Sequence, residues 1–240
     1  MLYEADKQRD TWAPEIPFTG LTGLSYRLKQ HQHLSRSGDR PHYLYQITNG
    51  WAGRYRLLSD GRRQITALYL AGDVCDPCWL DGDPIVQSVV ALTPLQTIRA
   101  ARKELEAQAS TDRGMMQFLR RKICFAQQIQ GEWLVNLGRK NAMERLCHLL
   151  CEFYCRLSLS GHVSGPSCEM PLTQQDLADL TGLTPVHVNR TLQEMRAMQL
   201  IDLQSRRLTI LDWASMRRIA RFDPAYLGAD AISEQLQAAA

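Results

Sequence analysis

Alternating apolar and polar positions divide the segment from residue 43 to residue 100 into short strands. The expected strands are YLYQI, WAGRYRLL, RQITALYL and IVQSVVAL. They are separated by residues that supply the positive φ angles of tight turns: Asn49-Gly50, Asp60-Gly61 and Ala71-Gly72-Asp73. Several short strands with regular turns predict a small β-barrel or β-roll.

The pattern changes to helical spacing between Thr111 and Leu137. Here one set of positions recurs every three or four residues for about three heptads: Met116, Leu119, Ile123, Ala126, Gln130, Trp133 and Leu137. A long helix with such a narrow seam usually packs against a copy of itself, although it can also lie across the chain's own β-roll. We predict a dimerisation helix over residues 111–138, ended by Gly138.

A second helix should follow, with an apolar face that includes Leu146, Leu150 and Leu157. A segment rich in Ser, Gly and Pro then predicts a loop, and the stretch LTQQDLADLTGLTPVHVNRTLQEMRAMQLI begins at residue 172. In this stretch Thr173 and Asp176 have the spacing of a capping box, and Gly182 suits a tight turn. Thr184 can cap a further helix that has Pro185 in its first turn. Helix, short turn and helix predict a helix-turn-helix.

The second helix of this motif has two distinct faces at about 100° per residue. Val188, Leu192 and Met195 should face the core. The opposite face carries no acid and consists of hydrogen-bonding or small side chains: Val186, Asn189, Arg190, Gln193 and Ala197. Such groups can read base edges in the major groove, although polar outer faces are also common in ordinary helical bundles.

The segment LIDLQSRRLTIL predicts a β-hairpin wing with Arg206 and Arg207 near its tip. The following segment adds the basic residues Arg217, Arg218 and Arg221. Basic side chains beside a recognition helix can bind phosphate, which fixes position without reading sequence. Together these elements predict a winged helix-turn-helix.

Composition fits two domains and adds few constraints. The 240 residues are 45% hydrophobic and 22% charged, and the formal net charge is +3. The N-terminus lacks the apolar segment of a signal peptide, and no stretch is apolar enough to span a membrane. We therefore expect a cytoplasmic protein without a membrane partner, whose seven cysteines are reduced thiols. The expected divisions are 1–110 for the β-roll, 111–138 for the helix and 139–240 for the winged helix-turn-helix.

In this order of parts, and in the stretches NGWAGRYRLLSDGRRQITALYLAGD and LTQQDLADLTGLTPVHVNRTLQEMRAMQLI, the chain resembles the family of the cyclic-AMP receptor protein and the fumarate-nitrate reduction regulator (CRP/FNR). The resemblance covers nearly the whole chain. It implies an α+β fold with a cupin-like β-roll of the cyclic-nucleotide-binding type. It also implies a homodimeric transcription regulator, not an enzyme, that binds a near-palindromic site in double-stranded DNA. RNA polymerase is a further expected partner.

The recognition helix departs from the family's pattern. An Arg-Glu pair near the start of that helix commonly contacts DNA in the family, whereas this chain has Pro185 and Val186 there and retains only the later Arg190. The half-site should therefore differ from that of the best-known members. The residues expected at DNA are Val186, His187, Asn189, Arg190 and Gln193, with Thr173, Thr184, Arg206 and Arg207 near phosphate.

The sensory side departs further. Members that bind cyclic AMP carry Gly-Glu and Arg-Ser pairs in the roll, where this chain has Asp76-Pro77 and Gln87-Ser88. Asp76 repels a phosphate, Gln87 cannot neutralise one and Pro77 lacks an N–H, so tight cyclic-nucleotide binding is not expected. An N-terminal iron–sulfur cluster is not expected either, because the first cysteine is Cys75. The candidate effector pocket comprises Cys75, Asp76, Cys78, Gln87 and Ser88.

Other uses of cysteine and histidine remain open as alternatives. Cys75 and Cys78 form a C-x-x-C pair that can bind metal or cycle between thiol and disulfide. His31, His33 and His42 could serve a metal or haem, and a cupin-like metal enzyme is a further alternative. Cys147, Cys151 and Cys155 share one helix face, where small buried residues recur in the same way. We expect no metal site and no cofactor, and the roll can also be a structural brace without a ligand.

Overall fold

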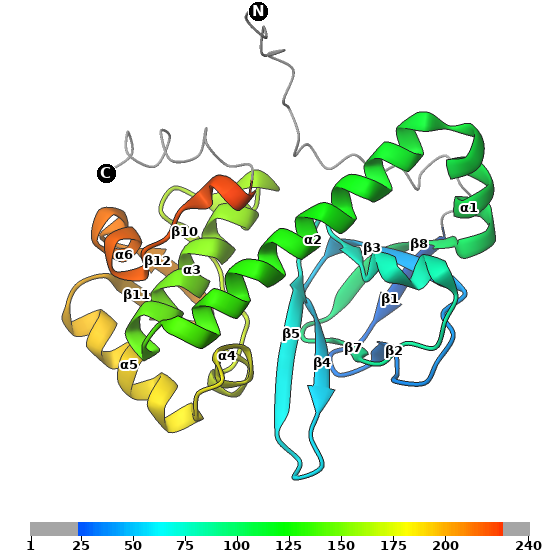
Figure 1. The fold of residues 1–240 in the computed structure, drawn as a ribbon. Coiled ribbons are helices and arrows are strands. Elements are labelled where there is room, and N and C mark those ends of the chain that lie inside the picture. Colours follow the sequence, from blue (N-terminus) through cyan, green and yellow to red (C-terminus); the bar gives the residue numbers. More distant parts are fainter. Residues whose placement is uncertain (1–23, 228–240) are drawn as a thin grey trace, which may run out of the picture.

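The computed structural model describes residues 24–227, within which the side chains of residues 77 and 78 are not described. Two units lie side by side along one long helix (Figure 1). The first is a β-roll built from residues before the helix, and the second is a mostly helical unit built from residues after it. Within the described residues, no helix is long and apolar enough to cross a membrane.

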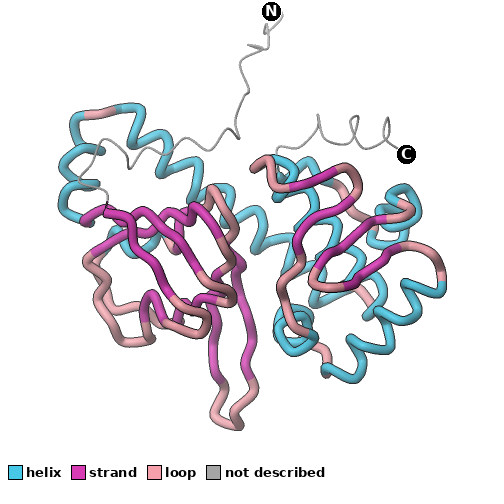
Figure 2. Tube along the Cα trace, turned by 180° about the vertical axis from the view of Figure 1, so that it is seen from behind, coloured by secondary structure: helices cyan, strands magenta, loops and turns pink. Residues whose placement is uncertain are grey.

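Two antiparallel four-stranded sheets form the roll. One has the strand order β1-β8-β3-β6 and the other β2-β7-β4-β5, and Figure 2 shows both from behind. The strands are β1 Leu24–Leu28, β2 His33–Ser35, β3 Tyr43–Asn49, β4 Ala52–Leu57, β5 Arg63–Tyr69, β6 Val74–Cys75, β7 Ser88–Ala91 and β8 Leu95–Ala101. A 3-10 helix, η2 (Pro77–Asp81), follows β6. The predicted β-roll is thus confirmed.

Two details of the predicted strands are wrong. Asn49-Gly50 does not form a hairpin, because β3 and β4 lie in different sheets and the pair makes the corner between them. Gly50 has a φ of 89°, and a Cβ there would lie 2.3 Å from the carbonyl oxygen of Pro94, so this corner requires glycine. The strand expected over residues 85–92 extends only over β7, and residues 85–87 lie outside it. The hairpin at Asp60-Gly61 joins β4 and β5 as predicted.

The long helix α2 spans Arg113–Arg139 and is preceded by a shorter helix, α1 (Arg102–Thr111). Asp112 lies between them, and its side chain accepts a hydrogen bond from the backbone N–H of Gly114. Gly138 lies inside the last turn of α2, so the prediction that it ends the helix is wrong. The helix ends at Lys140-Asn141, where the backbone becomes extended.

The second unit consists of helices α3 (Ala142–Leu159), α4 (Gln174–Thr181), α5 (Pro185–Ala197) and α6 (Trp213–Ala220), with a 3-10 helix, η3 (Pro224–Leu227). Its small antiparallel sheet has the order β11-β12-β10-β9. The strands are β9 Val163–Ser164, β10 Ser167–Glu169, β11 Ile201–Gln204 and β12 Arg207–Ile210. The segment before α4 was expected to be a loop, but it forms the hairpin β9–β10 that pairs with the wing.

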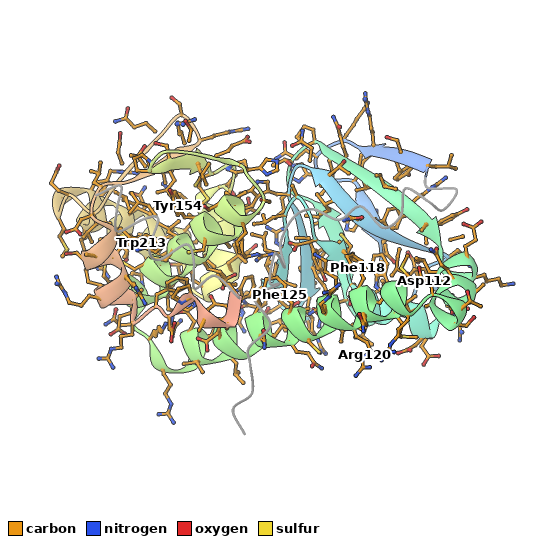
Figure 3. The ribbon with its side chains drawn as sticks, turned by 90° about the horizontal axis from the view of Figure 1, so that it is seen from above. Asp112, Phe118, Arg120, Phe125, Tyr154 and Trp213 are labelled. Atoms are coloured by element: carbon orange, nitrogen blue, oxygen red, sulfur yellow. The ribbon has the colours of Figure 1, made fainter. Side chains whose placement is uncertain are left out.

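Helix α2 contributes to the cores of both units. Met115, Phe118 and Leu119 pack into the core of the roll. Ile129 and Trp133 belong to a second core, in which α3 and the rest of the second unit pack against roll residues such as Trp51 and Ile65. In the view of Figure 3, Phe118 and Phe125 point from α2 toward the roll, whereas Arg120 points away from the molecule. The helix therefore joins the units with one face and leaves the opposite face exposed.

Candidate DNA interface and sensor cavity

The turn between α4 and α5 is built by local hydrogen bonds that the sequence predicts. Thr173 and Asp176 form a capping box at the start of α4. Gly182 ends α4 in the left-handed conformation, with a φ of 66°. Thr184 caps α5, since its hydroxyl accepts a hydrogen bond from the N–H of His187 at 3.2 Å. Pro185 occupies the first turn, where its missing N–H costs nothing.

The two faces of α5 are those expected from the sequence. Val188, Leu192 and Met195 are buried in the core. On the opposite face Val186 is 80% exposed, and Arg190 and Gln193 are exposed as well. His187 and Asn189 are half-buried on the flanks. The outward face therefore presents an apolar group at its start, then an amide, a guanidinium and a second amide.

The charge on this face is only weakly compensated. Arg190 lies 3.8 Å from Glu194, and the two side chains are 67% and 54% exposed. Such an exposed pair is worth little, so Arg190 can leave it for another acceptor. The expected phosphate contact of Thr173 is less free, because its hydroxyl donates to the Asp176 carboxylate at 2.6 Å.

The wing forms as predicted, with β11 and β12 paired and joined by Ser205 and Arg206. Both residues have positive φ angles, 48° and 61°, which suit a two-residue hairpin. Arg206 and Arg207 are exposed. In the next basic segment Arg217 donates to the carbonyl of Phe222 at 3.1 Å, and Arg221 lies 3.8 Å from Glu144. Arg217 is thus engaged with a neighbouring carbonyl, whereas Arg221, whose side chain is 80% exposed, is held as weakly as Arg190.

A cavity of about 160 Å³ lies between the roll and α2. Its lining is mostly apolar, and sequence reasoning missed it because it is shared by segments far apart in the chain. Among the lining residues are Arg54, Tyr69, Asp73 and Asp76 from the roll, Lys122, Phe125 and Ile129 from α2, and Arg156 from α3. The cationic groups already have protein partners. Lys122 donates to the carbonyl of Gly72 at 3.0 Å, and Arg156 donates to Asp73 at 2.6 Å.

The structure brings together only part of the predicted effector pocket. Asp76 and Gln87 line one hollow with Arg54, which donates to Asp76 at 3.2 Å. Gln87 accepts a hydrogen bond from the hydroxyl of Thr66. Cys75 and Ser88 line neither this hollow nor the larger cavity. Ser88 instead accepts a hydrogen bond from the backbone of Ser37, and the side chain of Cys78 lies outside the described part.

The cysteine and histidine candidates are held by ordinary packing. Cys75, Cys147, Cys151 and Cys155 are fully buried, and burial raises the pKa of each thiol, to about 12 for Cys147 and Cys155. His33 lies 2.8 Å from the hydroxyl of Tyr55. His31 and His42 are exposed. Among the described residues, no three potential metal-binding side chains of His, Cys, Asp or Glu lie together.

The predicted dimer seam requires correction. Leu119 is 3% exposed in the roll core, and Trp133 is 5% exposed in the other core, where its indole N–H donates to Glu152 at 2.9 Å. These two side chains are therefore unavailable to a second copy through the exposed face. Ala126 and Leu137 are half-buried as well. Met116, Ile123 and Gln130 remain at least partly exposed, and Leu134, which the seam omitted, is 75% exposed.

Two segments of the chain match known protein families. Residues 26–112 match the cyclic nucleotide-binding domain, and residues 144–219 match the Crp-like helix-turn-helix domain. The nitrogen fixation regulation protein FixK of Azorhizobium caulinodans is 32% identical over 178 residues, which cover 73% of this chain and 71% of that protein. This chain belongs to the CRP/FNR family of transcription regulators.

Other relatives support the assignment of this chain to the CRP/FNR family. The fumarate and nitrate reduction regulatory protein of Vibrio cholerae is 28% identical over 197 residues, covering 80% of this chain and 77% of that protein. The structure of FixK2 from Bradyrhizobium japonicum superposes with a TM-score of 0.75 at 25% identity, covering 83% of this chain and 98% of that one. The CRP/FNR regulator is thus a DNA-binding transcription regulator, as its sequence predicts.

Proposed function

We propose that this regulator acts as a homodimer that reads a near-palindromic DNA site with two α5 helices in successive major grooves. The observation that carries the proposal is the outward face of α5, where Val186, Arg190 and Gln193 are exposed while the opposite face is buried. Arginine pairs with guanine, amides pair with adenine, and an aliphatic group contacts the thymine methyl. Two-fold symmetry of the protein is matched by two half-sites about one helical turn apart.

The surface that we propose for dimerisation is an outer stripe on α2, which consists of Met116, Ile123, Gln127, Gln130 and Leu134. These residues follow heptad spacing at positions that the chain's own cores do not cover. Leu134 and Met116 are 75% and 43% exposed, so a contact with a second copy removes apolar surface from water. A second copy of the same helix, packed in parallel, buries them.

We further propose that this regulator does not bind cyclic AMP in the hollow at β6 and β7. A cyclic nucleotide needs an unpaired cation for its phosphate. Here Arg54 already pairs with Asp76, and the neutral Gln87 pairs with Thr66. The mostly apolar cavity against α2 is the better candidate site for a small effector, and we propose no metal, haem or cluster for it.

Selection of bound duplexes from a random DNA library tests the function. The expected result is a motif with two symmetric half-sites and an affinity that falls steeply with salt, since phosphate contacts release counterions. Recovery of unrelated sequences without symmetry would contradict the proposal.

The same experiment with Arg190→Ala tests the reading face. We expect the binding free energy to weaken by about 1–3 kcal/mol, because one guanine contact is lost. The base preference should also relax at one position of each half-site. Glu194→Gln should leave the selected motif unchanged, and it shows what loss of the exposed Arg190–Glu194 pair does on its own. An unchanged motif with Arg190→Ala would remove Arg190 from the reading face.

A further inference from the structure

Arg63 on β5 connects the roll to the first helix of the helix-turn-helix. Its Nε donates to Asp179 at 2.5 Å, and its Nη2 donates to Asp176 at 2.8 Å. The Arg63 side chain is 26% exposed, and the two carboxylates are 8% and 14% exposed. Charge-assisted hydrogen bonds in such a partly buried site are stronger than exposed ion pairs. One guanidinium thus binds two successive turns of α4.

The surroundings of Arg63 restrict where α4 can lie. The guanidinium lies 5.8 Å from the centre of the Tyr55 ring on β4. Beside it, the Gln64 amide donates to the carbonyl of Leu180 at 3.4 Å. Asp176 is also part of the capping box, and Asp179 also accepts from Gln175 at 2.8 Å. The contact is therefore built into both elements.

The far end of α4 is tied to the junction between α2 and α3. Arg145 donates to Thr181 at 2.9 Å, and it also donates to two carbonyls at the end of α2, those of Leu137 at 2.7 Å and Lys140 at 2.8 Å. Helix α4 is thus held along its length by the roll, and at its last residue by Arg145 of α3, which is itself bonded to the end of α2. Both contacts leave the outward face of α5 uncovered.

We propose that Arg63 is a positioning residue for DNA binding, which fixes the reading helix relative to the long helix and so sets the separation of two reading helices. The inference rests on the proposed function, because separation matters only in a dimer that binds two half-sites. A unit that can rotate must lose that freedom when it binds, and the loss weakens affinity. Because Arg63 is neutralised by two carboxylates, its role differs from that of a phosphate contact.

The test compares wild type and Arg63→Gln on duplexes whose two half-sites, taken from the selected motif, are separated by a series of spacer lengths. We expect Arg63→Gln to bind the preferred spacer about tenfold more weakly. We also expect it to lose less affinity than wild type does when the spacer changes by one base pair. Loss of folded protein would instead weaken binding equally at every spacer. Thermal unfolding checks that the variant is folded.

Three control variants distinguish a positioning role of Arg63 from a general effect of removing a surface charge. Arg62→Gln should behave as wild type, because Arg62 is 77% exposed and its ion pair within residues 24–227 is with the neighbouring Asp60. Arg63→Lys should restore part of the spacer preference. In an Asp179→Asn background, Arg63→Gln should cost less than it does in wild type, since one of the two carboxylate partners of Arg63 is already lost.

Some results would overturn the proposal. A phosphate contact predicts that Arg63→Gln lowers the salt slope of binding by about one, whereas a positioning role leaves the slope unchanged. Tighter binding by Arg63→Gln, or an unchanged spacer preference, would also refute a positioning role. If the wild-type protein selects no symmetric motif, the proposed function is wrong. That result differs from a refutation of the role of Arg63, which requires a symmetric motif in wild type and an unchanged spacer preference in Arg63→Gln.

Discussion

His148 is a fully buried side chain on α3. Its Nδ1 lies 2.7 Å from the Lys140 ammonium, and its ring stacks on Tyr226 with an interplanar angle of 5°. Burial and, next, the charge of Lys140 lower the pKa of His148 to about 3. The imidazole is therefore neutral at neutral pH and accepts a hydrogen bond from the lysine.

This histidine makes folding stability depend on pH. The unfolded chain binds a proton at His148 near pH 6.5, whereas the folded chain binds it only near pH 3. Its contribution is thus complete above pH 6.5 and is lost as pH falls toward 3. At pH 5 we expect a loss of about 2 kcal/mol in the free energy of unfolding.

Urea unfolding between pH 7.5 and 5 measures this loss. His148→Gln keeps a polar group near Lys140 but cannot bind the proton, so its stability should depend less on pH than that of wild type. The exposed His162 provides the comparison, and His162→Gln should retain the wild-type dependence. Equal pH dependence in wild type and His148→Gln would refute this account.

At this scale the sequence predicts single residues well where one local pattern decides their place. The faces of α5 follow from helical periodicity alone, and the caps Thr173 and Thr184 follow from local spacing. The roles of Arg63 and Arg156 do not, because their partners lie 113 or more and 83 positions away in the chain. Two adjacent arginines, Arg62 and Arg63, look alike in the sequence and differ entirely in their partners.

At the scale of elements, two glycines in helical surroundings have opposite structural roles. Gly182 ends α4 with a φ of 66°, and a Cβ there would have no neighbour closer than 3.7 Å. Glycine is therefore required at position 182 because of the backbone conformation, and not because a side chain would lack space. Gly131 lies within α2, and a Cβ there would meet nothing within 4 Å.

Alanine at these two glycines should change stability in opposite directions. Gly182→Ala should destabilise the fold by roughly 1–2 kcal/mol, because an L residue is strained in the left-handed conformation. Gly131→Ala should stabilise it by roughly 0.5–1 kcal/mol, because alanine favours the helix. Both free energies can be measured by urea unfolding, and a change of the same sign in both would contradict the assignment.

Elements with a strong period were predicted correctly, and so was the short wing hairpin, whereas the hairpin β9–β10 was not. Helices α2, α4 and α5 and strands β3, β4 and β5 were expected close to their actual ranges. The hairpin β9–β10 was missed because it consists of two and three residues rich in turn formers. Such strands are stabilised by pairing with the wing and not by any pattern of their own.

On the scale of the whole molecule, α2 shows why a correct period led to a wrong face. The spacing from Met116 to Leu137 is that of a coiled coil, but a single sequence does not reveal which neighbour each side chain meets. Leu119 packs into the core inside the roll, and Trp133 packs into the core between the roll and the second unit. The exposed apolar stripe is rotated away from both. Two of the seven predicted seam positions therefore face the chain's own cores, and dimerisation through the rest of the helix stays a prediction.

The outer stripe leads to a prediction about assembly. Leu134→Asp should weaken self-association at least tenfold, because a carboxylate cannot be buried between two helices without a partner. Val135→Asp is the matched control, since Val135 is 48% exposed and projects about 100° away around the helix. Sedimentation velocity across a concentration series measures the difference. Equal self-association of the two variants would exclude the outer stripe as the dimer surface.

The shared helix also limits how this architecture can be recombined. Because α2 contributes Leu119 to one core and Trp133 to the other, a cut at either end of the helix leaves one unit with an open hydrophobic groove. A chimera that joins this sensor to a foreign reading unit must therefore take the whole helix from one parent and adapt the other parent's core to it. Exchange of modules between such regulators is limited by one helix and not by the two domains that it joins.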